Sequence, residues 1–370
     1  MSETPSRTSR QQESILKSLR RDIIEGRAEP GSRLPARKDL VARFQAGPLT
    51  VQRAIDRLEQ DGFVRTENRR GSFVVDCPPH LYRFALVFTT HPDFGWTWSD
   101  QFLMTALAAA AQEINRTGEV TIELYTGLCE LDAAKRVEAT LLKEAHAGRL
   151  AGVILGHPYA GNLPARLGVP CASFYGKTDL PGILPVLLDR NAWYRQACAY
   201  LAEQGCKRVG VIGQSAIELA YIDTVKQIAP QYGLTYSPRW CQGIDARHRP
   251  WARHAAMALL GPEDPNDRPD AIFITDDSLI EDTAAGVLET GRSVPEDVLL
   301  VGLANFPIHG RDVLPVHRLG WDSRQVLICC LNAIRDHRLG RPLELPVEVP
   351  LRSDQNTFTV KTPLFTAASA

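Results

Sequence analysis

The first 75 residues of the chain combine short stretches of apolar periodicity with turn signals in a fixed order. Residues 11–26 place apolar side chains at helical spacing, and the Pro- and Gly-containing turn 30–35 separates them from a second short helix, predicted over 36–44. A break at 46–48 precedes a third helix, predicted over 49–61. Residues 64–75 are predicted to form a two-stranded hairpin. The pattern predicts a compact module of three helices closed by a β-hairpin.

This order of elements is typical of a winged helix-turn-helix, so double-stranded DNA is the first partner to consider. The charge distribution favours the same partner. Residues 1–80 contain 15 Lys and Arg against 11 Asp and Glu, a net charge of +4, whereas the remainder of the chain carries −5. A basic end on an acidic body fits a DNA contact that is confined to one end of the molecule.

The module resembles the GntR family of bacterial regulators. Four stretches carry the resemblance in register: GSRLPARKDL at 31–40, TVQRAI at 50–55, LEQDGFV at 58–64 and GSFV at 71–74. Two positions depart from the family. Gly47-Pro48 stand where Ser-Arg is usual, and Arg69 stands where glycine is usual. The missing arginine removes one contact to phosphate or base that the resemblance implies.

The first turn of the third helix supplies candidate DNA contacts at Thr50, Gln52 and Arg53, because that turn reaches base edges when such a helix enters the major groove. Gln52 could pair with adenine, and an arginine could pair with guanine. The alternative interpretation is that Arg53 and Arg57 only solvate the outer face of the helix.

Further DNA contacts are predicted outside the third helix. The resemblance implies a basic contact at Lys38, and it adds Arg33 and Gly71 to the candidates. Arg37, Arg69 and Arg70 are candidate replacements for the missing arginine. Arg69 and Arg70 at the hairpin tip suit a phosphate or minor-groove contact, although exposed hairpin tips are often charged in any case.

After a Pro-containing linker at 76–82, strands and helices alternate. Strands are predicted at 84–89, 120–126, 151–156 and 170–174, with helices at 100–116 and 131–148. The pattern then restarts with helices at 192–204, 217–232 and 278–290 and strands at 208–213, 271–275 and 298–303. We expect an α/β fold of two lobes, each a parallel sheet flanked by helices, with a ligand cleft at the carboxyl ends of the strands.

The second half of this body resembles the effector domain of the LacI/GalR family, whose fold is that of periplasmic sugar-binding proteins. The resemblance rests on the stretches 186–189, 201–210, 273–279, 291–305 and 349–353, of which Val294-Pro295-Glu296-Asp297-Val298 is the most specific. Together with the GntR-type head, it resembles regulators of the arabinose-repressor type. No hinge helix is predicted between Val75 and Phe84, because Pro78-Pro79 favours extended backbone. Linker geometry and dimer arrangement are therefore expected to couple body and head.

A sugar-like effector needs carboxylates or amides for its hydroxyl groups and aromatic rings for its apolar face. Asp277 matches the family's ligand-gripping aspartate, with helix capping as the alternative role. Asp276 is expected to support the turn, and Asn305 follows a later strand toward the cleft. The aromatic candidates are Trp96, Trp98, Tyr175 and Tyr221, although a loop holding Trp96 and Trp98 could equally pack on the surface or on a dimer partner.

The body also departs from its family at polar positions. Ala304 stands where many members have aspartate, Tyr221 where many have an arginine, and Asp189-Arg190 where Asp-Asn is usual. The alternatives left open are an atypical sugar, a non-sugar metabolite, or a body that serves dimerisation alone.

Other functional classes find little support. The eight cysteines lack Cys-x-x-Cys or Cys/His zinc spacing, no apolar run of 18 residues occurs, and residues 1–7 lack a signal core. No phosphate-binding glycine motif or nucleophile–base pair stands out. We therefore expect no catalytic residue, cofactor or metal, and no membrane segment.

The sequence thus predicts a lead-in at 1–8, a winged helix-turn-helix at 9–75, a linker at 76–82 and a two-lobed effector and dimerisation domain at 83–370. The predicted function is that of a cytoplasmic, homodimeric transcriptional repressor that binds a palindromic operator and responds to a small, carbohydrate-like effector.

Overall fold

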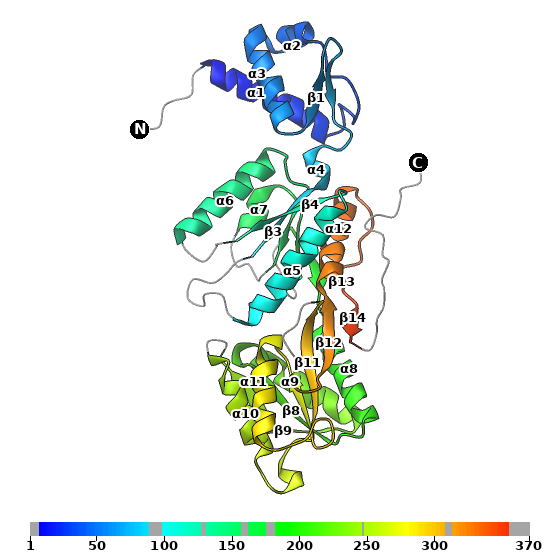
Figure 1. Cartoon of the computed structure of the whole chain (residues 1–370). Coiled ribbons are helices and arrows are strands. Elements are labelled where there is room, and N and C mark those ends of the chain that lie inside the picture. Colours follow the sequence, from blue (N-terminus) through cyan, green and yellow to red (C-terminus); the bar gives the residue numbers. More distant parts are fainter. Residues whose placement is uncertain are drawn as a thin grey trace.

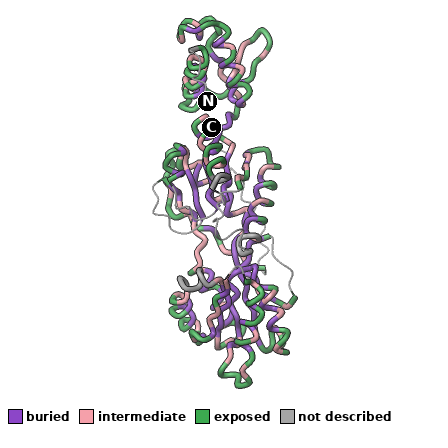
Figure 2. Tube along the Cα trace, turned by 90° about the vertical axis from the view of Figure 1, so that its left-hand side faces the viewer, coloured by how far each residue is buried: buried purple, intermediate pink, exposed green. Residues whose placement is uncertain are grey.

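The computed structural model describes residues 7–88, 98–126, 131–156, 162–174, 182–245, 248–307 and 313–354. These residues build an elongated molecule in which a small N-terminal head and two α/β lobes follow one another along one axis (Figure 1). In each lobe the buried residues follow the central strands, and exposed residues cover the outside (Figure 2). The fold class is therefore the predicted one.

The head consists of three helices and a hairpin: α1 (Arg7–Ile24), α2 (Arg37–Phe44), α3 (Pro48–Gln60), β1 (Val64–Glu67) and β2 (Gly71–Val74). The third helix begins at a proline, whose fixed φ and missing N–H suit the first helical position. Its apolar stripe packs on the stripe of α1, and both close on the base of the hairpin. The core includes Ile15, Leu19, Leu40, Val51, Leu58, Phe63 and Val74.

The linker contains an element that the sequence analysis did not predict. Residues Pro79–Tyr82 form one helical turn, α4, where extended backbone was expected. Pro78 is itself extended, at φ −67° and ψ 153°, and Pro79 takes the first helical position. The proline pair therefore starts this turn, as a proline at that position does in longer helices.

Lobe 1 is a six-stranded sheet in the order β13-β7-β6-β5-β3-β4, with every neighbouring pair parallel. Helices α5 and α12 cover one face of this sheet, and α6 and α7 cover the other. The elements are β3 (Arg83–Val87), α5 (Trp98–Arg116), β4 (Thr121–Tyr125), α6 (Leu131–His146), β5 (Gly152–Leu155), α7 (Leu163–Leu167), β6 (Cys171–Ser173), β7 (Ile183–Leu187), α12 (Ser323–Arg338) and β13 (Val347–Glu348).

Lobe 2 is a six-stranded sheet in the order β14-β12-β11-β10-β8-β9, parallel except for its edge strand β14. Helices α8 and α9 pack on one face, and α10 and α11 on the other. The elements are α8 (Arg190–Glu203), β8 (Arg208–Gln214), α9 (Ser215–Ile228), η1 (Ala229–Tyr232), β9 (Thr235–Ile244), α10 (Trp251–Leu260), η3 (Pro265–Asp267), β10 (Ala271–Ile274), η4 (Asp277–Leu279), α11 (Ile280–Glu289), β11 (Leu299–Phe306), β12 (His317–Asp322) and β14 (Leu351–Ser353).

The chain crosses between the lobes three times: from β7 to α8, from β12 to α12, and from β13 to β14. One apolar core runs through both lobes along these crossings. Trp193 of α8 is fully buried in it and donates its indole N–H to the carbonyl of Leu319 in β12, at 2.8 Å. Because the lobes share one core and are joined by three crossing segments, a movement of one lobe relative to the other has to bend those segments.

Candidate DNA-binding and effector-binding sites

The outward face of α3 carries the first group of predicted DNA contacts. Arg53 is exposed, whereas Gln52 is half-buried and its side-chain nitrogen donates to Asp56 Oδ1 at 2.5 Å. Thr50 is only 6% exposed and packs in the head core. Burial thus excludes Thr50 from contact with DNA. Of the residues predicted on this helix, Gln52 and Arg53 remain accessible.

The start of α2 and the turn before it carry Arg33, Arg37 and Lys38, all of them exposed. Arg37 and Lys38 form no ion pair with any described residue, so their charge is available to an anion. Arg33 lies against the hairpin, where it forms an isolated antiparallel bridge with Phe73. A Cβ atom built on Gly71 would lie 2.8 Å from Arg33 Nε, so Gly71 permits this close approach.

The hairpin tip places Arg69 and Arg70 in solvent. Arg70 pairs with Glu67 at 2.6 Å, but its side chain remains 74% exposed. Arg69 has φ of +63°, in the left-handed region that favours glycine. The family's usual glycine at this position is thereby explained, and in this chain an arginine adopts the same turn at a cost in backbone energy.

In lobe 2 the two neighbouring aspartates have separate roles. Asp276 caps η4: its Oδ1 accepts hydrogen bonds from the backbone N–H and the hydroxyl of Ser278, at 2.9 and 2.6 Å. Its other oxygen accepts from the side-chain amide of Gln214 at 2.5 Å. Asp277 is therefore not the cap, and its carboxylate is left for another function.

Asp277 is 3% exposed, and its Oδ2 accepts a hydrogen bond from Asn305 Nδ2 at 2.8 Å. The structure thus brings together two of the predicted effector residues, from η4 and β11. Burial raises the pKa of Asp277 well above its usual value, and the nearby Asp276 charge adds to this, while Asn305 and Arg318 oppose it. A buried carboxyl at the junction of two lobes can either accept or donate a hydrogen bond to a ligand hydroxyl group.

Three polar residues around this pair were not among the predicted effector contacts. Arg318 of β12 is 2% exposed and influences Asp277 electrostatically. Gln214 ends β8, and Arg190 begins α8, from which it donates to the carbonyl of Thr275 at 3.2 Å. Arg318 was missed because strand β12, on which it lies, had not been predicted. Gln214 could have been found, because it directly follows a predicted strand.

The remaining effector candidates have less structural definition. Trp96 and Tyr175 lie outside the described residues. Trp98 begins α5 and Tyr221 lies within α9, but their side chains are outside the described part of the molecule. Ala304 is fully buried in β11 with its carbonyl close against Gly320. Because side chains alternate along a strand, Ala304 and Asn305 point to opposite faces of the sheet.

The two lobes meet at this site. Helix α5 of lobe 1 packs against η4 and β11 of lobe 2, the segments that carry Asp277 and Asn305. Figure 1 shows the N-terminal end of α5 reaching toward lobe 2. Asp277 and Asn305 thus lie on segments of lobe 2 that contact lobe 1.

The head is attached to lobe 1 by a group of charged residues that we call the neck cluster: Arg20, Asp61, Arg149 and Glu144. Asp61 accepts from Arg20 Nη2 at 2.5 Å and from Arg149 Nη1 at 2.9 Å. All three side chains are less than 10% exposed. Arg149 also donates Nε to Glu144 at 2.6 Å, a bond that holds the pKa of Glu144 below its usual value.

Apolar contacts surround the neck cluster. Phe63 of the head stacks on His80 of α4 with ring centroids 6.0 Å apart, and Arg20 lies over Phe63 at 5.4 Å. Gly148, at φ +65°, follows α6, and a Cβ atom there would lie 2.3 Å from Ile24 Cδ1. Desolvation, together with the nearby Arg338 charge, lowers the pKa of His80 to about 4. The head thus contacts lobe 1 directly, beyond the linker that the sequence analysis expected to provide the coupling.

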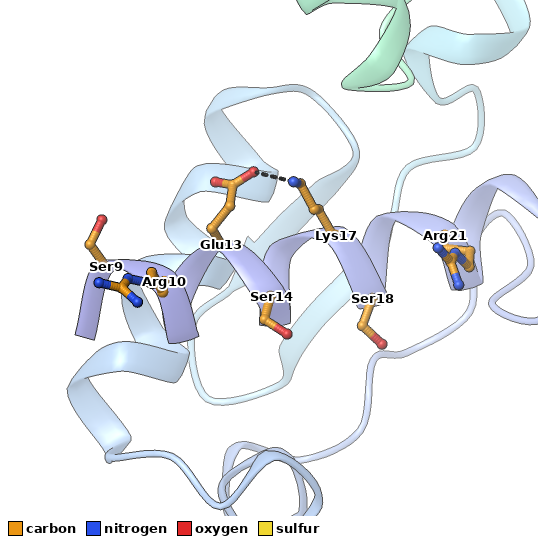
Figure 3. Close-up of a pocket in the computed structure, with 7 residues that line it drawn as sticks. All are labelled: Ser9, Arg10, Glu13, Ser14, Lys17, Ser18 and Arg21. Atoms are coloured by element: carbon orange, nitrogen blue, oxygen red, sulfur yellow. Dashed lines mark ion pairs between the residues drawn. The ribbon is translucent and has the colours of Figure 1, made fainter. Parts of the chain in front are cut away.

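A shallow polar hollow of about 610 Å³ lies along α1, and every residue lining it comes from that helix. Figure 3 shows the Glu13–Lys17 ion pair on one side of the helix and Ser14, Ser18 and Arg21 on another. The hollow is a helix surface well apart from the junction of the lobes. Within the described segments, no group of three or more His, Cys, Asp or Glu is placed to hold a metal ion.

Comparison with protein families identifies both parts of the chain. Residues 11–74 match the bacterial regulatory proteins of the gntR family, and residues 198–316 match the periplasmic binding protein-like domain. The HTH-type transcriptional repressor YtrA of Bacillus subtilis (strain 168) is 31% identical over 62 residues, which are 17% of this chain and 48% of YtrA. The chain thus spans about half the length of this curated relative, and only through its head.

Solved structures share the fold of the body. The transcription regulator CcpA of Lactococcus lactis has a TM-score of 0.56 at 14% identity, over 74% of this chain and 97% of CcpA. A LacI family transcriptional regulator from Lactobacillus casei with bound glucose has a TM-score of 0.53 at 17% identity, over 73% of this chain and 97% of its own.

Helices of the described segments fall short of the length and apolar character needed to cross a bilayer. The two domain matches and the shared fold agree with the resemblance seen in the sequence. The chain carries a GntR-type winged helix-turn-helix head joined to a periplasmic-binding-protein-like body of the fold found in LacI-family regulators.

Proposed function

We propose that the protein is a transcriptional regulator, acting as a repressor, whose affinity for operator DNA changes when a small carbohydrate-like ligand binds between the two lobes. The observation that carries this proposal is the neck cluster, because it joins a DNA-binding head to one lobe of a ligand-binding fold through buried charges. A movement of lobe 1 therefore moves the head with it.

The DNA contact would come from the end of the head that faces away from lobe 1. Helix α3 runs from Pro48 to Gln60 and is about 20 Å long at 1.5 Å per residue. Its C-terminal end contacts lobe 1 through Asp61, so its N-terminal turn is free to enter a major groove. Exposed Arg37, Lys38 and Arg53 would pair with phosphates or bases, and Arg69 and Arg70 would follow the backbone from the wing.

The effector site would be centred on Asp277 and Asn305. A carboxyl and an amide held 2.8 Å apart can together bind a pair of neighbouring hydroxyl groups, the feature common to sugars. The sugar-bound relative from Lactobacillus casei supports this ligand class. A homodimer would translate lobe movement into a changed spacing of two heads on a palindromic site, which a ligand can drive only through its differential affinity for the two arrangements.

The test combines DNA selection with a ligand screen on the full chain. Rounds of selection from random duplexes should yield a palindromic consensus, and fluorescence anisotropy should then measure its affinity with and without each of a panel of sugars, sugar phosphates, polyols and nucleosides. We expect one class to change the affinity by about 5- to 150-fold, the usual range of allosteric coupling.

Each alternative has its own result. A consensus without any ligand effect, and without ligand-induced thermal stabilisation, would leave a ligand-independent DNA-binding protein whose body serves dimerisation. A response confined to a compound other than a carbohydrate would identify a non-sugar sensor. Failure to select any sequence would refute the regulatory function itself.

A further inference from the structure

Leu49 is the most exposed of the large hydrophobic side chains in the described segments, at 63%. It occupies the second position of α3, directly after Pro48. Folding offers no reason for it, because the apolar stripe of α3 is complete without it: Val51, Ala54, Ile55 and Leu58 are all buried. Single exposed leucines are common on protein surfaces, so the argument depends on where this one lies.

The position of Leu49 identifies the surface to which it belongs. Residues three and four positions apart share a helix face, so Leu49 lies on the same face as Gln52 and Arg53. Leu49 also lies in the first turn of α3, at the positive end of the helix dipole, and exposed Arg37 and Lys38 begin the neighbouring helix α2. An exposed apolar side chain on a helix face that also carries Arg53, next to a helix that begins with two exposed cations, matches DNA, whose grooves lie between two rows of phosphates.

The groove contains one apolar group that such a side chain can bind. In the major groove only thymine presents a methyl group, at C5, and apolar side chains discriminate thymine through it. We propose that Leu49 is a specificity-determining residue that reads a thymine methyl group in each half of the operator. This inference rests on the proposed DNA-binding function, and it assigns to the first turn of α3 a contact of a different chemistry from the polar ones.

Pro48 strengthens the assignment. A proline at the first helical position fixes φ and has no rotatable side chain that could reach a base. Pro48 therefore cannot make the DNA contact that the family's usual arginine makes at this position. Thr50 is buried and Gln52 is hydrogen-bonded to Asp56. Leu49 and Arg53 are thus the two residues of the first turns whose side chains are both exposed and free of such constraints.

The experiment uses the full chain and a duplex obtained by selection with the wild-type protein. Each thymine of the selected duplex is replaced in turn by deoxyuridine, which lacks only the methyl group. For the wild type we expect one symmetric pair of positions at which the replacement lowers affinity by about fourfold per half-site, the effect of burying one methyl-sized group. For Leu49→Ala we expect equal affinity for the thymine and deoxyuridine duplexes.

Two further variants keep the outcome decisive. Leu49→Met keeps an apolar side chain of similar size and should retain the preference for thymine, whereas Leu288→Ala removes another exposed leucine, on α11, and should change nothing. The proposal is overturned if wild-type protein tolerates deoxyuridine at every position, or if Leu49→Ala discriminates as the wild type does. Failure to select a duplex at all would instead refute DNA recognition, so the two failures are distinct.

Discussion

Arg69 shows how a single residue can depart from a family pattern while the backbone keeps it. Its φ of +63° lies in a region where a side chain costs about 1 kcal/mol relative to glycine. The structure gives this arginine no stabilising ion pair within the described residues. A charge kept at such a cost on the tip of the wing points to a contact outside the chain.

Replacing Arg69 should therefore separate stability from DNA binding. We expect Arg69→Gly to leave thermal stability unchanged or to raise it slightly, and to weaken DNA binding because one phosphate contact is lost. Asn also tolerates the left-handed region, so Arg69→Asn is the matched control for added chain flexibility. The salt dependence of affinity is the measurement, and its slope should fall by about 0.9 per lost contact. An unchanged slope in both variants would remove Arg69 from the interface.

Asp277 leads to a second prediction at this scale. A folded-state pKa raised above the unfolded value of 3.8 means that the ionised carboxyl opposes folding. The stability that the protonated carboxyl provides is fully present below the unfolded pKa and is lost as pH rises through the folded pKa. Asp277→Asn should thus unfold at a higher temperature than the wild type at pH 7, and the difference should shrink toward pH 4.

The same variant should lose the response of DNA affinity to the ligand while keeping basal DNA binding. Asp277 Oδ2 already accepts from Asn305, so in the variant the amide NH2 group would face the ligand and could not accept from its hydroxyl group. Calorimetric melting across pH and anisotropy with ligand measure the two effects. A variant that is more stable yet responds normally would show that Asp277 is structural only.

At the scale of elements, the sequence predicted most of the helices and strands with clear periodicity, but it missed α10, whose buried residues follow helical spacing, and several elements without a clear pattern. The three helices of the head and the buried strands β5, β8 and β10 lie where apolar spacing placed them, within a few residues. Strand β12 was not predicted because its residues, His317 to Asp322, include Arg and Gly. The arginine is buried only through tertiary contacts.

The candidate sites divide in the same way. Asp276, Asp277 and Asn305 were predictable because each follows or ends an apolar strand, and ligands in open α/β sheets bind at the carboxyl ends of the strands. The neck cluster was not. Asp61 and Arg149 are 88 residues apart, and each looks in the sequence like an ordinary surface charge at a helix end. Only the packing of the head on lobe 1 makes them partners.

The α4 turn leads to a pH prediction. The pKa of His80 falls from 6.5 to about 4 on folding, through burial and the Arg338 charge, and Phe63 and Arg20 occupy the facing side. The neutral ring is preferred in the folded state, so stability is fully present above pH 6.5 and is lost as pH falls toward 4. Between pH 7 and 4.5 the loss should be about 2–3 kcal/mol.

The variant His80→Phe keeps the aromatic contact with Phe63 and removes the titration. Its melting temperature should fall less than that of the wild type over this pH range, and the difference between the two curves isolates His80 from the carboxylates that titrate nearby in pH. Parallel curves would mean that His80 is protonated as readily in the folded protein as in the unfolded chain.

At the scale of the whole molecule, the question is how a ligand between the lobes could affect a head at the far end. The shared core and three crossings join lobe 2 to lobe 1, and the neck cluster joins lobe 1 to the head. A flexible linker would transmit only a change in distance. Buried ion pairs fix orientation as well, because each requires defined geometry at both ends.

The neck cluster is therefore the place to separate DNA binding from its regulation. Arg149→Leu keeps much of the buried side-chain volume and leaves Asp61 paired with Arg20 and Arg57, but it removes the link to lobe 1 and the partner of Glu144. Breaking one partner of a buried pair typically costs about 3 kcal/mol, so the contact between head and body should loosen. DNA affinity without ligand should change little, since α3 and the wing are untouched.

The ligand-induced change in DNA affinity should fall toward onefold in this variant, and by thermodynamic reciprocity the effect of DNA on ligand affinity should fall by the same factor. Both affinities can be measured, by anisotropy and by calorimetry. Arg166→Leu is the matched control, because that arginine on lobe 1 is exposed and pairs with Glu138, away from the neck cluster. If Arg149→Leu keeps the full coupling while Arg166→Leu does too, the signal passes through the dimer arrangement or the linker, and the head is oriented by contacts other than the neck cluster.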